Sequence, residues 1–65
     1  MFLTFDKKSF QIRADNGLIL CTKYVPREIQ TAVLNGNLVV VTTKDGTWVY
    51  RQVGTSPVFN FYKQY

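Results

Sequence analysis

Four carboxylates are the first candidates for chemistry in this sequence, which contains no histidine to act as a general base. They are Asp6, Asp15, Glu28 and Asp45. The three aspartates lie at or beside predicted turns, where aspartate is an ordinary residue. Their spacing gives no indication of the paired carboxylates of a glycosidase. We therefore expect no acid–base catalysis from a single chain.

Nucleophiles and metal ligands are equally sparse. Cys21 is the only cysteine, and its apolar surroundings in the sequence predict a small buried side chain. Ser9 and Ser56 lack a flanking nucleophile motif, and the four glycines are isolated, so no phosphate-cradling loop is present. A lone cysteine without histidine also excludes a Cys/His zinc site within one chain. The sequence thus predicts a protein that is not an enzyme and holds no metal and no cofactor.

Length and composition limit the architecture to one small domain spanning residues 1–65, with 46% hydrophobic and 18% charged residues. No apolar run approaches the ~20 residues that cross a bilayer, and the first residues lack the order of a signal peptide. A single cysteine suits a reducing compartment. We therefore expect a cytoplasmic protein that does not contact membranes.

Short segments rich in β-branched and aromatic residues alternate with turn signals along the chain. Asn16–Gly17, Asn35–Gly36 and Asp45–Gly46 are typical of hairpin turns, because glycine adopts positive φ freely. We predict an all-β domain, a small antiparallel meander of five to six strands curled as an SH3-like barrel or a strongly bent sheet. The alternative is an α+β fold with one short helix at 26–34, where Pro26 would suit the first turn.

The segment 38–53 is expected to form the best-defined hairpin. With Asp45–Gly46 as its loop, Val41 would lie opposite Tyr50, and side chains would alternate between two faces. One face carries four large apolar residues: Val39, Val41, Trp48 and Tyr50. The other carries Leu38, Val40, Val49 and Val53. Both faces are apolar, and a 65-residue chain has material for only one core.

The two faces receive different roles in our interpretation. The aliphatic face suits a packed interior, whereas Trp48 and Tyr50 can bury a large area and still keep a hydrogen-bonding group. We therefore assign Trp48 and Tyr50, supported by Val39 and Val41, to a binding surface. The function predicted is non-catalytic protein–protein association, with another protein or with a second copy in a homo-oligomer. The competing interpretation is that Trp48 anchors the core.

Two further possibilities remain open at this point. The aromatic-rich segment 59–65 could close the barrel, or it could reach a neighbouring chain as an added strand. The net charge of +4 and the 15% aromatic content also allow a small barrel that stacks single-stranded nucleic acid. In that alternative the phosphate contacts would come from basic residues along the chain: Lys23, Arg27, Lys44 and Arg51. The charge excess is small for a dedicated phosphate binder, so protein association is the leading hypothesis.

Overall fold

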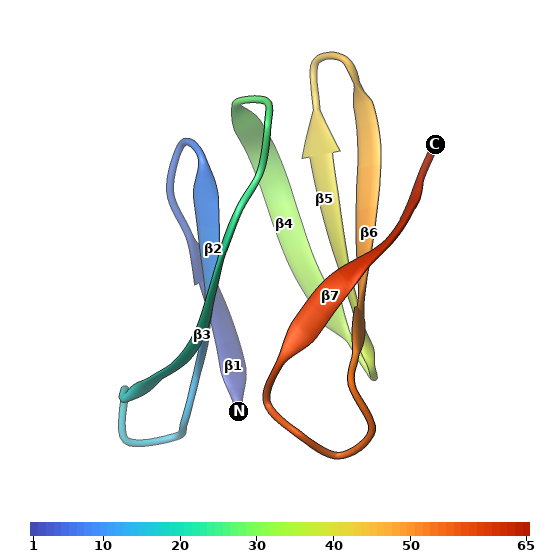
Figure 1. The fold of residues 1–65 in the computed structure, drawn as a ribbon. Helices are drawn as coiled ribbons and strands as arrows, with labels where there is room; N and C mark the ends of the chain where they lie inside the picture. The colour runs from blue at the N-terminus through green and yellow to red at the C-terminus, as the bar shows by residue number, and fades with distance from the viewer.

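The computed structural model describes residues 1–65 as seven strands and no helix (Figure 1). The strands are β1 (Phe2–Phe5), β2 (Ser9–Arg13), β3 (Ile19–Tyr24), β4 (Ile29–Asn35), β5 (Leu38–Thr43), β6 (Gly46–Gln52) and β7 (Phe59–Gln64). The predicted all-β class is confirmed, with seven strands in place of five or six. The alternative helix at 26–34 is wrong, because this segment supplies most of β4 instead.

The seven strands form two antiparallel sheets that face each other as two layers (Figure 1). The first sheet has the order β1-β2-β3 and the second the order β4-β5-β6-β7, so each is a meander. Neither sheet closes on itself, and the fold is therefore an open sandwich of bent sheets rather than a barrel. The molecule consequently keeps four edge strands.

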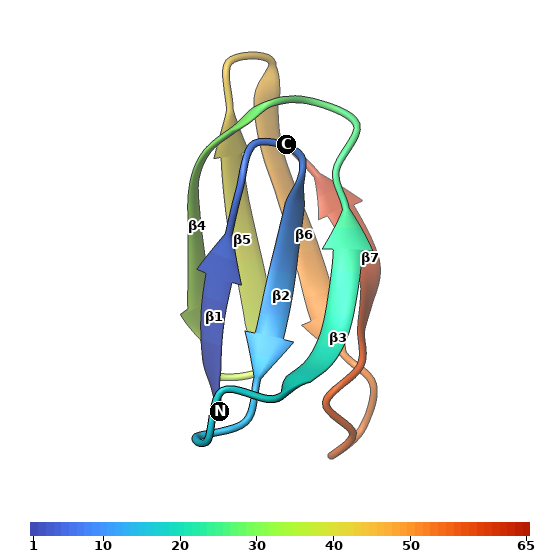
Figure 2. The same cartoon turned by 90° about the vertical axis from the view of Figure 1, so that its left-hand side faces the viewer.

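The connection between β3 and β4 carries the chain from one layer to the other across the end of the sandwich (Figure 2). Its backbone is fixed to the β1–β2 turn: the Val25 NH donates to the Lys8 carbonyl at 2.8 Å, and the Ile29 NH donates to the Lys7 carbonyl at 2.7 Å. Pro26 follows the buried Val25 and has no NH to donate, so it cannot extend the ladder of β3. The chain leaves the first sheet at this point.

The register of the β5–β6 hairpin differs from the prediction by two residues. Val41 lies opposite Trp48 and Val39 opposite Tyr50, and the two residues of the turn are Lys44 and Asp45. Because side chains alternate with a period of two, a shift of two residues leaves the grouping into faces unchanged. The predicted pairing was therefore wrong, whereas the predicted membership of each face is confirmed.

The assignment of the two faces is reversed in the structure. Val39, Val41, Trp48 and Tyr50 lie on the inner face, with exposed fractions of 0%, 0%, 7% and 5%. The ring of Tyr50 packs edge-on against the ring of Phe10 from the other sheet, with the centroids 4.9 Å apart. Large aromatic rings fill the space between the layers. The aliphatic face lies on the outer side of the sheet, where Val49 is still buried at 6% exposed and Val53 is 46% exposed. The interpretation of these four residues as an exposed binding surface was therefore wrong.

Candidate functional site

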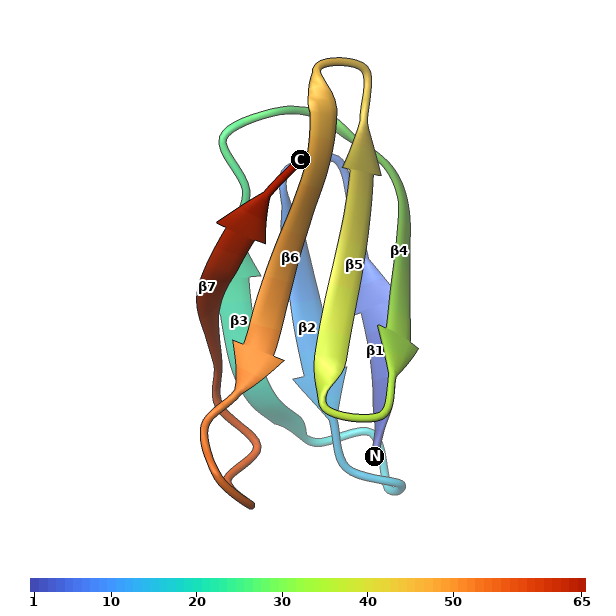
Figure 3. The same cartoon turned by 90° about the vertical axis from the view of Figure 1, so that its right-hand side faces the viewer.

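The two sides of the sandwich differ. On one side β1 lies along β4, which closes the gap between the layers (Figures 2 and 3). On the other side lie β3 and β7, which are joined by one side-chain hydrogen bond, from Lys23 Nζ to Asn60 Oδ1 at 3.2 Å (Figures 2 and 3). We call the side formed by β3 and β7 the open edge.

Phe61 marks the place where the core reaches this open edge. Its partner across the β6–β7 pair is Tyr50, so its side chain lies on the inner face of the sheet. The rings of Phe61 and Tyr50 meet edge-on with centroids 5.9 Å apart, yet Phe61 is 56% exposed. Phe59, two residues earlier on the same face, is fully buried. The three-stranded sheet packs against a four-stranded sheet and covers the inner face of β7 only in part. It covers Phe59 and leaves Phe61 exposed.

Exposed apolar side chains concentrate at the same edge. Thirteen large hydrophobic residues are exposed, and eight of them lie on β3 or β7 or within one residue of these strands: Leu18, Ile19, Leu20, Tyr24, Val58, Phe61, Tyr62 and Tyr65. Neither strand pairs with another on its outer side. The open edge thus combines unpaired backbone with apolar surface, which is the combination that other chains recognise.

Cations border this apolar surface. The guanidinium of Arg51 lies 4.2 Å from the ring centre of Tyr62, and Lys63 Nζ lies 5.0 Å from that of Tyr65. Lys23 reaches the edge through its bond to Asn60. The only ion pairs in the chain are the N-terminal amine with Asp15 and Arg27 with Asp45. The three cations at the open edge therefore have no carboxylate partner.

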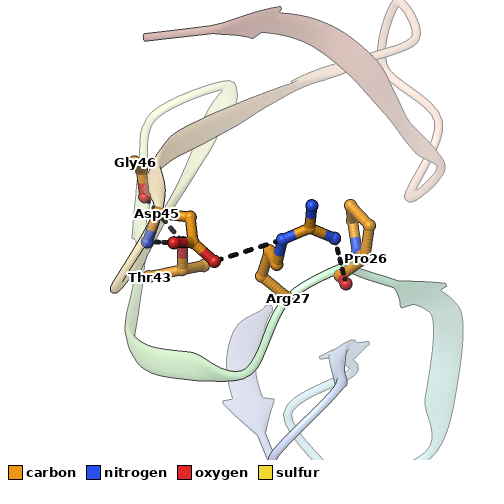
Figure 4. Close-up of polar contacts among 5 residues, drawn as sticks. All are labelled: Pro26, Arg27, Thr43, Asp45 and Gly46. Atoms are coloured by element: carbon orange, nitrogen blue, oxygen red, sulfur yellow. Dashed lines mark hydrogen bonds and ion pairs between the residues drawn. The ribbon is translucent and has the colours of Figure 1, made fainter.

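The four basic residues predicted as phosphate contacts occupy two separate places. Arg27 lies in the β3–β4 connection, and its Nε is 3.2 Å from Oδ2 of Asp45 (Figure 4). Lys44 precedes Asp45 in the β5–β6 turn. Lys23 and Arg51 lie on strands that border the open edge. The predicted set therefore does not form one patch, and Arg27 is already paired with a carboxylate.

Phe61, Tyr62 and Lys63 were not among the predicted site residues. The signal in the sequence was the run of aromatic residues in 59–65, which places aromatic side chains on both faces of a strand. The sequence does not show that β7 is an edge strand, nor that the three-stranded sheet covers its inner face only in part.

Three titratable groups, Asp6, Asp15 and Tyr50, have shifted pKa values, and each shift has a structural cause. The hydroxyl of Ser9 and the backbone NH of Lys8 donate to Asp6, which lowers the pKa of its carboxyl. The N-terminal amine lowers the pKa of Asp15, and burial raises the pKa of the Tyr50 hydroxyl. The three shifts therefore arise from hydrogen bonds in a turn, from the charge of the N-terminus and from burial in the core.

An open pocket of about 340 Å³ lies within the β6–β7 hairpin. Its lining includes Arg51, Asn60 and Tyr62. It contains no carboxylate and no thiol, and its only hydroxyl is that of Tyr62. No cluster of three or more potential metal ligands occurs in the chain. The structure also contains no helix with the length and apolar character needed to span a bilayer. The pocket therefore adds the polar groups of Arg51, Asn60 and Tyr62 to the surface beside the open edge, where they are able to bind a partner.

The chain was compared with protein-family models, with curated proteins and with solved structures. None of the three comparisons found a match.

Proposed function

We propose that this chain is a non-catalytic association module that binds another protein chain at the open edge. The observation that carries this proposal is the position of Phe61, which faces the core side of β7 and is nevertheless 56% exposed. A partner that covers this ring completes the packing that the three-stranded sheet leaves unfinished. Full burial of a phenylalanine side chain contributes roughly 1.5–3 kcal/mol.

The surroundings of Phe61 support the same function. Tyr62 and Tyr65 are exposed at the same strand, and tyrosine is enriched at interfaces because it combines a large apolar area with a polar group. The partner is either a different protein or a second copy of this chain. Cys21 is a free thiol, which is consistent with a reducing compartment such as the cytoplasm.

Binding of single-stranded nucleic acid is the second candidate. Two exposed tyrosines, Tyr62 and Tyr65, each have a cation over the ring, and stacking beside a cation is how such proteins hold bases. Trp48, the only tryptophan of the chain, is buried and is not available for stacking. This alternative predicts binding that weakens steeply with salt.

The test is a selection of displayed random peptides of about eight residues, the length of one strand. Phe61→Ala and Val33→Ala form a matched pair, because both side chains are 56% exposed and Val33 lies on the opposite edge strand β4. We expect Phe61→Ala to weaken the selected peptides by about tenfold, and Val33→Ala by less than about twofold. Circular dichroism checks that both variants remain folded.

Equal losses in the two variants, or the absence of any selected peptide, would contradict association at this edge. Sedimentation of the free chain shows whether the partner is a second copy. A self-associating chain gives a species heavier than 7.5 kDa that Phe61→Ala returns to the monomer.

A further inference from the structure

We propose that the occupant of the open edge is an extended acidic segment of another protein, which adds a strand to the free side of β7. This inference rests on the proposed function and names the chemistry of its partner. Three features carry it: the direction of the backbone groups of β7, the blocking of β3, and the charges around Phe61.

The backbone of β7 presents free hydrogen-bonding groups at this edge. At the start of the β6–β7 pair, the Val53 NH donates to the Val58 carbonyl at 2.9 Å. In an antiparallel pair, residues that bond the neighbour alternate with residues whose NH and carbonyl groups point away. The backbone NH and carbonyl groups of Asn60 therefore point toward β6. Those of Phe59 and Phe61 point away from β6, to the free side of β7. No strand pairs with β7 on that side.

The neighbouring edge strand β3 is less suited to strand addition. Lys23 lies opposite Phe10, whose side chain is fully buried, so Lys23 is on the inner face of its sheet. An inward-pointing charge on an edge strand is a common device that prevents pairing with another chain. The ammonium of Lys23 instead reaches across to Asn60 and adds a cation to the border of β7.

The charges at this edge select an acidic partner. Lys63 lies on β7 itself, and Arg51 and Lys23 lie on the strands beside it, β6 and β3. None of the three has a carboxylate partner in the chain. A second copy would bring the same cations against each other, and the whole chain carries a net charge of +4. Carboxylates of a different protein would neutralise them. This complementarity favours a foreign acidic segment over self-association.

The alternation of side chains along a strand refines the description of the partner. The β6–β7 register is irregular after Phe61, so Phe61 lies opposite Tyr50 on the inner face and Lys63 lies opposite Val49 on the outer face. One face of the added strand would therefore cover Phe61 and must be apolar, whereas the other face would lie beside Lys63 and must carry carboxylates. A nucleic acid would also attract the cations, but its backbone lacks the regular row of NH and carbonyl groups that pairs with the outward groups of Phe59 and Phe61. The edge therefore favours a polypeptide over a nucleic acid.

The experiment titrates the ¹⁵N-labelled full chain with three probes and follows amide exchange by NMR. The probes are a peptide of about eight residues that alternates glutamate and valine, the same peptide with lysine in place of glutamate, and an oligothymidylate. We expect the glutamate peptide alone to bind and to slow exchange at the amides of Phe59 and Phe61. Higher salt should weaken this binding, because Arg51 and Lys63 are exposed.

Charge variants test the role of the border. We expect Lys63→Glu to weaken the glutamate peptide by about three- to tenfold. Lys44→Glu makes the same change in the β5–β6 turn and should alter binding by less than about twofold. Lys63→Gln, which removes the charge without reversing it, should fall between the two.

Three results would overturn the inference. These are equal binding of the lysine peptide, displacement of the glutamate peptide by oligothymidylate, and unchanged exchange at Phe59 and Phe61. If the display selection returns neutral or basic peptides that still require Phe61, the proposed function stands and the acidic partner is wrong. If no peptide of any composition requires Phe61, both fail.

Discussion

The exposed ring of Phe61 packs edge-on against the buried ring of Tyr50, with the two centroids 5.9 Å apart. Tyr50 makes the same kind of contact with Phe10 of the other sheet at 4.9 Å. The three rings thus form a continuous path from the centre of the core to the open edge. Phe61 is the uncovered end of the core rather than an isolated apolar residue on the surface, and scattered single residues of that kind would need no explanation.

Replacement of Trp48 by alanine tests the corrected position of this residue. Trp48→Ala removes a 7% exposed indole from the core, so we expect the free energy of unfolding to fall by about 3–5 kcal/mol. That loss is comparable with the whole stability of a small domain. Urea denaturation followed by circular dichroism measures it. Tyr24→Ala, at an 80% exposed position, should change stability by about 0.5 kcal/mol or less, and a similarly mild effect at Trp48 would contradict the core assignment.

The sequence of the β5–β6 hairpin predicts its two faces but not which of them is inside. Alternation groups Trp48 with Tyr50 and Val40 with Val49, whatever the turn. The choice between the faces depends on the second sheet, whose Phe10 and Ile12 supply the other half of the core. The alternation of side chains within one hairpin does not show which of its faces packs against Phe10 and Ile12 of the other sheet.

The open edge could be predicted only in part. The aromatic run in 59–65 indicates a strand that needs cover, and both alternatives for it, closure of the fold or addition to another chain, follow from the sequence. Whether the first sheet is wide enough to cover β7 depends on the crossing of residues 25–28 to the far side of the sandwich (Figure 2). That crossing leaves three strands opposite four, and no local pattern specifies it.

Gly46 is the glycine that the packing requires most strictly. Its φ of +133° is rarely adopted by other residues, and a Cβ built there would lie 2.7 Å from the backbone oxygen of Tyr65. We expect Gly46→Ala to lower the free energy of unfolding by about 1–3 kcal/mol and to loosen the pairing of Thr47 with Tyr65. Thermal denaturation and exchange of the Tyr65 amide measure the two effects.

Gly36→Ala provides the matched control for Gly46. Gly36 also has a positive φ, +61°, but a Cβ there would meet no atom within 4 Å. We expect only the cost of the left-handed backbone, about 1 kcal/mol. Equal losses in the two variants would show that the close approach of Tyr65 has no energetic effect.

Acid should destabilise the β1–β2 turn. Asp6 Oδ1 accepts hydrogen bonds from the NH and the hydroxyl of Ser9 at 3.0 and 2.9 Å, which hold its pKa below the ordinary value. A depressed pKa in the folded state stabilises the protein above about pH 4, and this contribution is lost as the pH falls through the folded pKa. Asp6→Asn should therefore flatten the fall of the melting temperature between about pH 5 and pH 2. Glu28→Gln changes a carboxylate that makes no hydrogen bond or ion pair in the chain. An equal flattening in that variant would contradict the role of Asp6.

Alkali should destabilise the core through Tyr50. Burial raises the pKa of its hydroxyl, so the stabilisation is complete below about pH 10, the ordinary value, and is lost as the pH rises through the higher folded value. Tyr50→Phe keeps the ring between Phe10 and Phe61 but removes the group that ionises. We expect urea midpoints of this variant to fall less than those of the unmodified chain between about pH 9 and pH 11.

The control for Tyr50 is Tyr24→Phe, which removes a hydroxyl at a position that is 80% exposed. The Tyr24 variant should follow the unmodified chain throughout the alkaline range. If Tyr50→Phe loses stability as steeply as both of them, the hydroxyl of Tyr50 is hydrated in the folded state, and the path of rings from Phe10 to Phe61 is open to water at its middle member.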